Sequence, residues 1–246
     1  MGEAARDGGR SSAAPPAFLI TCEHGGNRVP RPYRALFDAC PGLLDSHRGY
    51  DAGALTMARQ LATSFSAPLL VSTTSRLLVD LNRSIGHPTL FSAWTRKLPA
   101  DRRAQILDRY YRPYRTAADR WVEEAVSRGR RVIHLSSHSF TPELEGKLRS
   151  ADVGLLYDPA RSGEAALCAL WKRALGTALP DLRVRRNYPY AGKGDGLTAH
   201  LRRRFPDDAY IGIELEINQA IVHAAGRPWA RLRSALIDSL RIACDH

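Results

Sequence analysis

The chain has 246 residues, of which 44% are hydrophobic and 25% charged, a balance typical of a soluble globular protein with a sizeable core. Its 36 basic and 25 acidic residues give a formal net charge of +11, yet only four of the basic residues are lysines. The arginines are spread among acidic residues along expected helices, as in 119–124. This distribution indicates solvated helix faces and a coding bias towards arginine, and we expect no nucleic-acid partner.

The sequence shows neither a membrane span nor a secretory signal. No apolar run approaches the roughly 18 residues of a membrane helix, and residues 1–16 are polar and rich in Gly, Ala and Ser. The four cysteines are far apart and form no C-x-x-C pattern, which is typical of reduced thiols. We therefore expect a cytoplasmic protein without a membrane partner, with a disordered tail over 1–16 and one domain over 17–246.

From residue 17 onwards, apolar strand-like runs alternate with amphipathic helical stretches. Strands are expected at 17–23, 68–73, 131–137, 152–157, 182–187 and 209–217. Helices are expected at 52–65, 101–127, 162–178, 197–205 and 228–243, with a kink or break near Pro113. This alternation predicts an α/β fold: a single domain with a mostly parallel mixed sheet, covered by helices on both faces. Long loops remain at 24–50, 74–100 and 187–197, and such loops beside a crevice are usually functional.

Two of the expected strands end in a histidine. His24 follows the first strand and precedes two glycines, which allow the backbone to turn tightly, and His138 follows the third strand. The last strand carries Glu214 and Glu216 at a spacing that places both on one face. Because ligands of open α/β sheets bind outside the carboxyl ends of the strands, we expect these side chains to converge. Two imidazoles near acidic groups are typical of a divalent metal site with a general base.

Other interpretations of these residues exist. A lone strand-end histidine is more often a packing or capping residue, and it is the pairing of His24 with His138 that favours metal ligation. His134 lies deeper in its strand and is expected in the core. A zinc site needs a third protein ligand, and the candidates are Glu23, Asp51 and Asp80. Asp51 precedes a helix and could equally act as its N-cap.

The last strand and the arginine-bearing segments suggest further roles. Glu214 and Glu216 could lie on a solvated edge, but the flanking isoleucines indicate burial, which raises a carboxyl pKa and suits a general base. Asn82 and Arg83 end an apolar segment, as expected for a clamp on a substrate carboxylate, with Arg76 as a further candidate. A surface ion pair would also explain a single arginine. The glycine-rich stretch 187–198 is too irregular for a phosphate loop, and is either a mobile surface loop or a lid.

Taken together, these motifs resemble the N-formylglutamate amidohydrolase family. The resemblance runs in order over 17–225, through His24-Gly25-Gly26, Gly49-Tyr50-Asp51, Ser75-Arg76 with Asp80-Leu81-Asn82-Arg83, Ser137-His138-Ser139, Gly196-Leu197-Thr198 and Leu215-Glu216-Ile217-Asn218-Gln219. It implies a phosphorylase/hydrolase-like α/β fold, distantly related to zinc carboxypeptidases and succinylglutamate desuccinylases. Asn27 stands where the H-x-x-E pattern of zinc carboxypeptidases has its glutamate, and among the remaining carboxylates Asp51 is preferred over Glu23.

The resemblance also implies an activity. It suggests a zinc-dependent amidohydrolase that cleaves the N-acyl, first of all N-formyl, amide of a small acidic amino acid such as N-formylglutamate. One Zn²⁺ per chain would be held by His24, Asp51 and His138, with Glu216 preferred over Glu214 as the catalytic base. The expected substrate-binding residues are Arg76, Asn82, Arg83 and Thr198. The alternatives are another N-acyl amino-acid or peptide amidase or, from a different class, a basic nucleic-acid-binding protein. The oligomeric state is left open.

Overall fold

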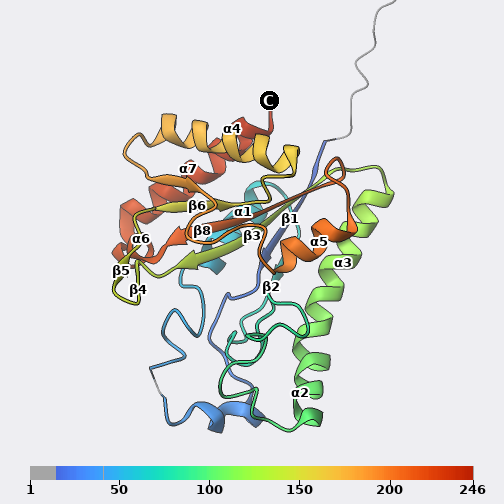
Figure 1. The fold of residues 1–246 in the computed structure, drawn as a ribbon. Helices are drawn as coiled ribbons and strands as arrows, with labels where there is room; N and C mark the ends of the chain where they lie inside the picture. Colours follow the sequence, from blue (N-terminus) through green and yellow to red (C-terminus); the bar gives the residue numbers. More distant parts are fainter. Residues whose placement is uncertain (1–14, 41, 246) are drawn as a thin grey trace, which may run out of the picture.

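The computed structural model describes residues 15–40 and 42–245, so the tail expected over 1–16 lies almost wholly outside the described residues. Its centre is a six-stranded sheet of order β2-β1-β3-β8-β6-β7 (Figure 1). The strands are β1 (Ala17–Cys22), β2 (Leu69–Val71), β3 (Val132–Phe140), β6 (Val153–Leu156), β7 (Val184–Arg186) and β8 (Tyr210–Asn218). β2, β1, β3 and β8 run parallel, whereas β6 pairs antiparallel with β8. The expected mostly parallel mixed sheet is confirmed.

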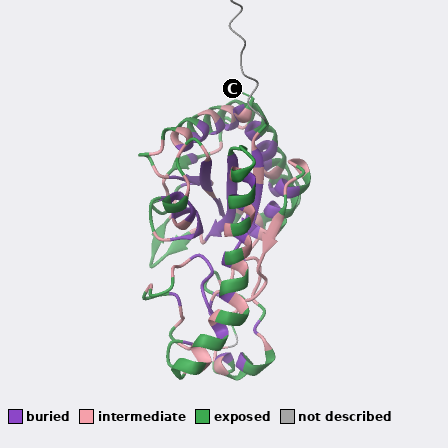
Figure 2. Cartoon of the chain, turned by 90° about the vertical axis from the view of Figure 1, so that its right-hand side faces the viewer, coloured by how far each residue is buried: buried purple, intermediate pink, exposed green. Residues whose placement is uncertain are grey.

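Helices cover both faces of this sheet. They are α1 (Ala54–Ser64), α2 (Ala100–Ile106), α3 (Arg112–Ser127), α4 (Ser162–Ala178), α5 (Leu197–Arg204), α6 (Gln219–Ala224) and α7 (Gly226–Cys244). Alternate residues of β1 point to opposite faces: Ile20 belongs to the cluster formed with α1, α4 and α7, and Leu19 to the cluster formed with α3 and α5. Figure 2 shows the central strands of the sheet as buried and the outer side of α3 as exposed, and β1, β3, β6 and β8 are indeed the strands whose residues are mainly buried.

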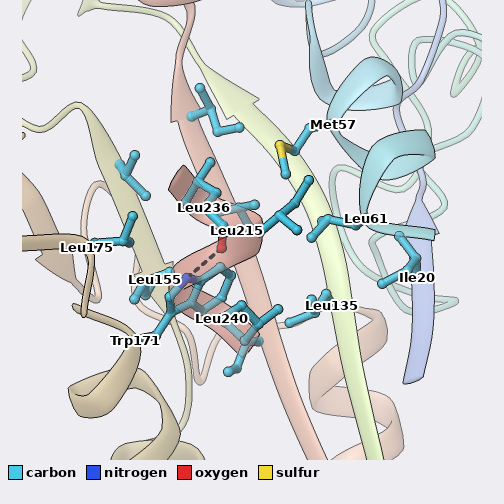
Figure 3. Packing of buried hydrophobic residues seen from close by; sticks show 14 of the residues in the cluster. Ile20, Met57, Leu61, Leu135, Leu155, Trp171, Leu175, Leu215, Leu236 and Leu240 are labelled. Carbon is cyan, nitrogen blue, oxygen red and sulfur yellow. Dashed lines mark hydrogen bonds between the residues drawn. The ribbon is translucent and has the colours of Figure 1, made fainter. Parts of the chain in front are cut away.

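The larger cluster joins α4 and α7 to the sheet (Figure 3). Trp171 of α4 is fully buried, and its indole Nε1 donates a hydrogen bond of 3.1 Å to the Leu236 carbonyl of α7. Leu155 of β6 and Leu215 of β8 pack in the same cluster. A buried indole needs a partner for its N–H, so this bond fixes how the two helices lie on the sheet.

Near Pro113, where the sequence predicts a kink or break, the helix contains a π-helical turn. A π-helical turn over Leu107–Tyr111 connects α2 to α3, and Pro113 occupies the first turn of α3. Proline has no N–H to donate to the preceding turn, and a π-helical turn accommodates the interruption without ending the helix. The helix expected over 101–127 is therefore present in three consecutive parts.

The two long loops build a second core beside the sheet. Buried residues of 24–50, including the 3-10 helix η1 (Arg31–Phe37), pack against buried residues of 74–100 and against Ile106 of α2. This part lies below the sheet in the view of Figure 1. A hairpin of β4 (Glu143–Leu144) and β5 (Lys147–Leu148) was not expected from sequence. Its two-residue turn has positive φ at Glu145 (51°) and Gly146 (74°), as hairpin turns of the primed types require.

Within the described residues, no helix has both the length and the apolar character needed to cross a membrane.

Candidate active site

A cavity of about 400 Å³ lies where β1, β3 and β8 end. Every residue predicted from sequence to form the site lines it, with the exception of Thr198: His24, Asp51, Arg76, Asn82, Arg83, His138 and Glu216. These residues come from five separate parts of the chain, and the parallel strands bring His24, His138 and Glu216 to one edge of the sheet. The expected convergence is confirmed.

His24, Asp51 and His138 form a buried group that could hold a metal ion, with one ligand atom from each lying within 4.8 Å of the others. Both histidines turn their Nδ1 atoms towards Asp51 Oδ2, at 3.3 Å for His24 and 2.8 Å for His138. The backbone of Gly26 passes close to the segment after β2, because a Cβ there would meet the Thr73 carbonyl oxygen at 2.8 Å. Glycine at this position thus lets the chain turn away directly after His24.

Asp51 does not cap a helix. α1 begins at Ala54, two residues later than expected, and its N-cap is Gly53 in the left-handed conformation (φ 80°) without a side-chain capping bond. The Asp51 carboxylate is buried and bonds to the two histidines and to Arg76. The sequence leaves Asp51 open as a helix N-cap or as a metal ligand, and its position agrees with the metal-ligand interpretation.

The other two candidate ligands lie behind the histidines. Asp80 Oδ1 is 2.7 Å from His24 Nε2, and Glu23 Oε2 is 3.1 Å from His138 Nε2. Ser136 Oγ donates to Glu23 Oε2 at 2.6 Å. When a carboxylate accepts the Nε2 proton of an imidazole, Nδ1 is left with its lone pair, which fixes both the tautomer and the ring orientation for ligation.

The position of Glu23 follows from the register of β1 against β3. Thr21 of β1 pairs with Ser136 of β3, so two residues further on Glu23 comes opposite His138. The hydroxyl of Tyr114, from α3, lies 3.0 Å from Glu23 Oε1. No sequence pattern indicated the Tyr114 contact, because α3 reaches the back of the site only through the tertiary fold.

Electrostatics favour a cation between these groups. Burial opposes ionisation, but Coulomb and hydrogen-bond interactions with His24 and His138 hold the pKa of Asp51 well below its usual value. Arg76 and His24 do the same for the pKa of Asp80, and His138 and Ser136 for the pKa of Glu23. The guanidinium of Arg76 lies 3.3 Å from Asp51 and 2.8 Å from Asp80.

The carboxylates of Glu23, Asp51 and Asp80 carry three negative charges and the Arg76 guanidinium one positive charge, a net charge of −2 that a divalent cation would balance. Burial alone would lower the pKa of His138, yet its bonds to Asp51 and Glu23 raise it well above the usual value, so a positive charge is favoured here. Two imidazoles and a carboxylate are also a donor set that binds divalent metals such as zinc. The residues present therefore fit a metal ion.

Glu216 lies directly beside this group. It pairs in register with His138 across β3 and β8 and is only 5% exposed. Its Oε2 is buried and has no hydrogen-bond partner among the described residues. Burial first, and then the charge of Asp51, raise its pKa to about 8. The raised pKa expected from the sequence pattern is thus present.

Glu214 and Thr198 form a pair at the cavity wall. Glu214 lines the cavity, and its Oε1 accepts a hydrogen bond of 2.6 Å from Thr198 Oγ1. Thr198 is fully buried and lies behind Glu214, outside the lining of the cavity. Thr198 therefore does not face the cavity itself and can affect it only by orienting Glu214.

Asn82 and Arg83 connect the cavity to the glycine-rich segment 187–197. Asn82 Oδ1 accepts from Leu197 N at 2.7 Å, and Arg83 Nη1 donates to the Asp195 carbonyl at 2.7 Å. The Asp195 carboxylate accepts from Ser84 N at 2.8 Å and from Ser84 Oγ at 2.5 Å. Bonds at this end make the segment a fixed wall of the cavity, which argues against the mobile surface loop that the sequence left open.

The fold and site define an α/β protein with a candidate metal centre at the carboxyl ends of its strands. The model of the N-formylglutamate amidohydrolase family matches residues 17–222, and the chain belongs to this family.

Solved structures agree on the fold. The gene product Atu2144 from Agrobacterium tumefaciens is similar with 28% identity and a TM-score of 0.81, over 95% of this chain and 92% of that one. An N-formylglutamate amidohydrolase from Ralstonia eutropha JMP134 has 24% identity and a TM-score of 0.66, over 94% and 95%. A metallo-carboxypeptidase from Burkholderia cenocepacia, at 12% identity and a TM-score of 0.37 over 95% and 57%, is too distant to support an argument. No match is found among curated proteins.

Proposed function

We propose that this protein is a zinc-dependent amidohydrolase that cleaves the N-acyl, first of all N-formyl, amide of an acidic amino acid such as N-formylglutamate. The observation that supports this most is the pairing of the His24–Asp51–His138 group with the unpartnered Glu216 Oε2 in one cavity. Membership of the N-formylglutamate amidohydrolase family points to the same chemistry.

His24, Asp51 and His138 would hold the metal through the two Nδ1 atoms and a carboxylate oxygen. A divalent metal supplies Lewis-acid chemistry, which polarises an acyl carbonyl and makes a water molecule more acidic. Glu216 takes the proton of the attacking water at its free Oε2 and delivers it to the leaving amine. Its pKa, raised to about 8, suits both steps, because near neutral pH both the carboxylate that accepts a proton and the acid that delivers it are accessible.

Arg83 and Asn82 hold the substrate beside this centre. Arg83 lines the cavity, and among the residues that the structure describes it donates only to backbone carbonyls, while its buried Nε has no partner. A substrate carboxylate would satisfy this guanidinium by a charge-assisted hydrogen bond. Arg76 contributes its charge from its place beside Asp51, and Thr198 contributes by orienting Glu214.

The test combines metal content with turnover. The purified protein should contain about one zinc per chain and release formate from N-formyl-L-glutamate. A chelator should abolish the release, and added zinc should restore it. N-acetyl and N-succinyl glutamate, assayed in parallel, separate the formyl preference from a broader N-acyl amidase activity. Absence of both metal and turnover after zinc is added would contradict the proposal.

A further inference from the structure

Two arginines carry positive charge into the cavity, and they differ in how they are bound. Arg76 pairs with the carboxylates of Asp51 and Asp80. Arg83 has no carboxylate within ion-pair distance among the described residues. The cavity lining thus offers one uncommitted guanidinium, enough for one substrate carboxylate. An acidic N-acyl amino acid has two carboxylates, so a second cation is required.

Arg149 provides such a cation at the rim. It directly follows the β4–β5 hairpin, where its backbone N–H donates to the Pro142 carbonyl at 2.8 Å. Its guanidinium lies over the ring of Tyr190, 5.0 Å from the centroid, and its Nη1 donates to the Tyr190 hydroxyl at 3.0 Å. Tyr190 lines the cavity and is 47% exposed. Arg149 is therefore held against a residue of the cavity wall.

A second aromatic ring fixes Arg149 relative to the metal centre. The guanidinium is also 5.8 Å from the ring centroid of Phe140, the last residue of β3, the strand that carries His138. Stacking on two aromatic rings restricts the orientation of the guanidinium while leaving N–H donors free at its edge. In the described part of the chain, no carboxylate lies within ion-pair distance of Arg149.

The charges of Arg149 and Asp51 both act on the pKa of His47. Burial lowers the pKa of His47 most, the neighbouring arginines, including Arg149, lower it further, and Asp51 opposes them. His47 is thus exposed to the charges of both Arg149 and Asp51. Outside the candidate metal group, the cavity is lined by the cationic Arg76 and Arg83 and by three acidic residues, Asp195, Glu214 and Glu216. A further cation at the rim would therefore favour the binding of a distal carboxylate.

We propose that Arg149, positioned by Tyr190 and Phe140, binds the side-chain carboxylate of the substrate while Arg83 binds the other carboxylate. Arg149 is then the residue that selects acidic N-acyl amino acids over neutral ones. This inference depends on the proposed function, because it assigns a specificity to the same amidase site.

The experiment compares N-formyl-L-glutamate with the nearly isosteric, uncharged N-formyl-L-glutamine, using zinc-loaded full-length protein. The wild type should prefer the glutamate compound. Arg149→Ala should lower kcat/KM for formylglutamate by about 10- to 100-fold, the range expected for a lost charge-assisted hydrogen bond. The same variant should keep its kcat/KM for formylglutamine within about twofold, which also shows that it is folded.

Arg185→Ala is the matched control. Arg185 stacks on Tyr188 at the same 5.0 Å, but it is exposed and Tyr188 does not line the cavity. This variant should behave as the wild type with both substrates.

Equal losses of Arg149→Ala on both substrates, or no loss on formylglutamate, would overturn the role of Arg149 and leave the amidase proposal intact. Hydrolysis of neither compound by the wild type would overturn both.

Discussion

Each histidine of the candidate metal group is held from behind by a carboxylate. Asp80 binds Nε2 of His24, and Glu23 binds Nε2 of His138, so both rings turn Nδ1 towards Asp51. Tyr114 and Ser136 in turn hold Glu23. Such outer carboxylates orient the imidazole and increase its basicity, so they contribute to metal affinity without touching the metal.

Glu23→Gln should therefore weaken metal binding. The substitution removes the charge behind His138 and should lower zinc affinity by about 10- to 100-fold, measured by competition with a chelator of known affinity. Tyr114→Phe is the control: it removes one donor to Oε1 and leaves the Oε2 contact with His138, so its effect should be smaller. Wild-type zinc affinity in Glu23→Gln would contradict the positioning role of Glu23.

Glu216→Gln should separate chemistry from metal binding. The amide fills the same volume but takes no proton, so kcat should fall by at least about 100-fold while the zinc content stays at the wild-type level. Glu214→Gln is the matched control, because Glu214 lies two residues away on the same strand and is bonded to Thr198. Near-wild-type turnover in Glu216→Gln, or equal losses in both variants, would rule out Glu216 as the base.

Between the strands and the cavity wall, the backbones approach closely at Gly154 of β6. A Cβ at this position would meet the Tyr188 carbonyl oxygen at 2.0 Å and Glu216 Cβ at 3.2 Å. The segment that carries Tyr190 therefore crosses directly over β6, beside the strand that carries Glu216. Only glycine permits this approach of two backbones.

Gly154→Ala should accordingly disturb the cavity wall. The added methyl group must displace the backbone of the 187–197 segment, which should cost about 1–3 kcal/mol of unfolding free energy and raise KM. Gly176→Ala lies in the last turn of α4, where no described atom outside the neighbouring helix backbone is within 4 Å of the new Cβ, and should instead stabilise the protein by up to about 0.5–1 kcal/mol. Urea unfolding measures both changes. If Gly154→Ala left the free energy of unfolding unchanged, the 187–197 segment would be able to move aside without loss of stability, which would contradict the prediction.

The stability of the protein as a whole depends on pH through His134, a histidine that does not line the cavity. His134 is fully buried in β3, and its nitrogens lie 2.8 Å from Thr21 Oγ1 and 2.6 Å from the Tyr210 hydroxyl. It is a core histidine, as the sequence predicted. Burial lowers its pKa from 6.5 to about 4.

The sign of the resulting pH dependence follows from proton binding. Above pH 6.5, His134 is neutral in both the folded and unfolded states. As the pH falls from 6.5 to about 4, only the unfolded chain binds a proton at this residue, so stability decreases. The contribution lost over this window is about 3 kcal/mol.

His134→Gln should lack this contribution. Urea unfolding between pH 7 and 4 should show a shallower loss of stability in the variant than in the wild type, whatever its stability at pH 7. His223→Gln, at an exposed position in α6, is the control and should follow the wild-type curve. If the free energy of unfolding fell with pH equally in His134→Gln and in the wild type, the prediction would be refuted.

The six strands of the sheet, its mixed and mostly parallel character, and the convergence of His24, His138 and Glu216 could be predicted from the amino-acid sequence. These follow from local patterns: apolar runs of strand length, the alternation of strands with helices, and the rule that parallel strands end at one edge. The short β4–β5 hairpin was missed because its strands have two residues each and no alternation to detect.

The contacts among the converging groups could not be predicted without the three-dimensional structure. The sequence left Glu23, Asp51 and Asp80 as alternatives, because which imidazole nitrogen faces which carboxylate depends on loops that fold back from 27 and 56 residues away. Likewise, Arg149 meets Tyr190 across 41 residues. Strand periodicity fixes which side of a sheet a residue points to, whereas contacts between separate loops depend on how the whole chain packs.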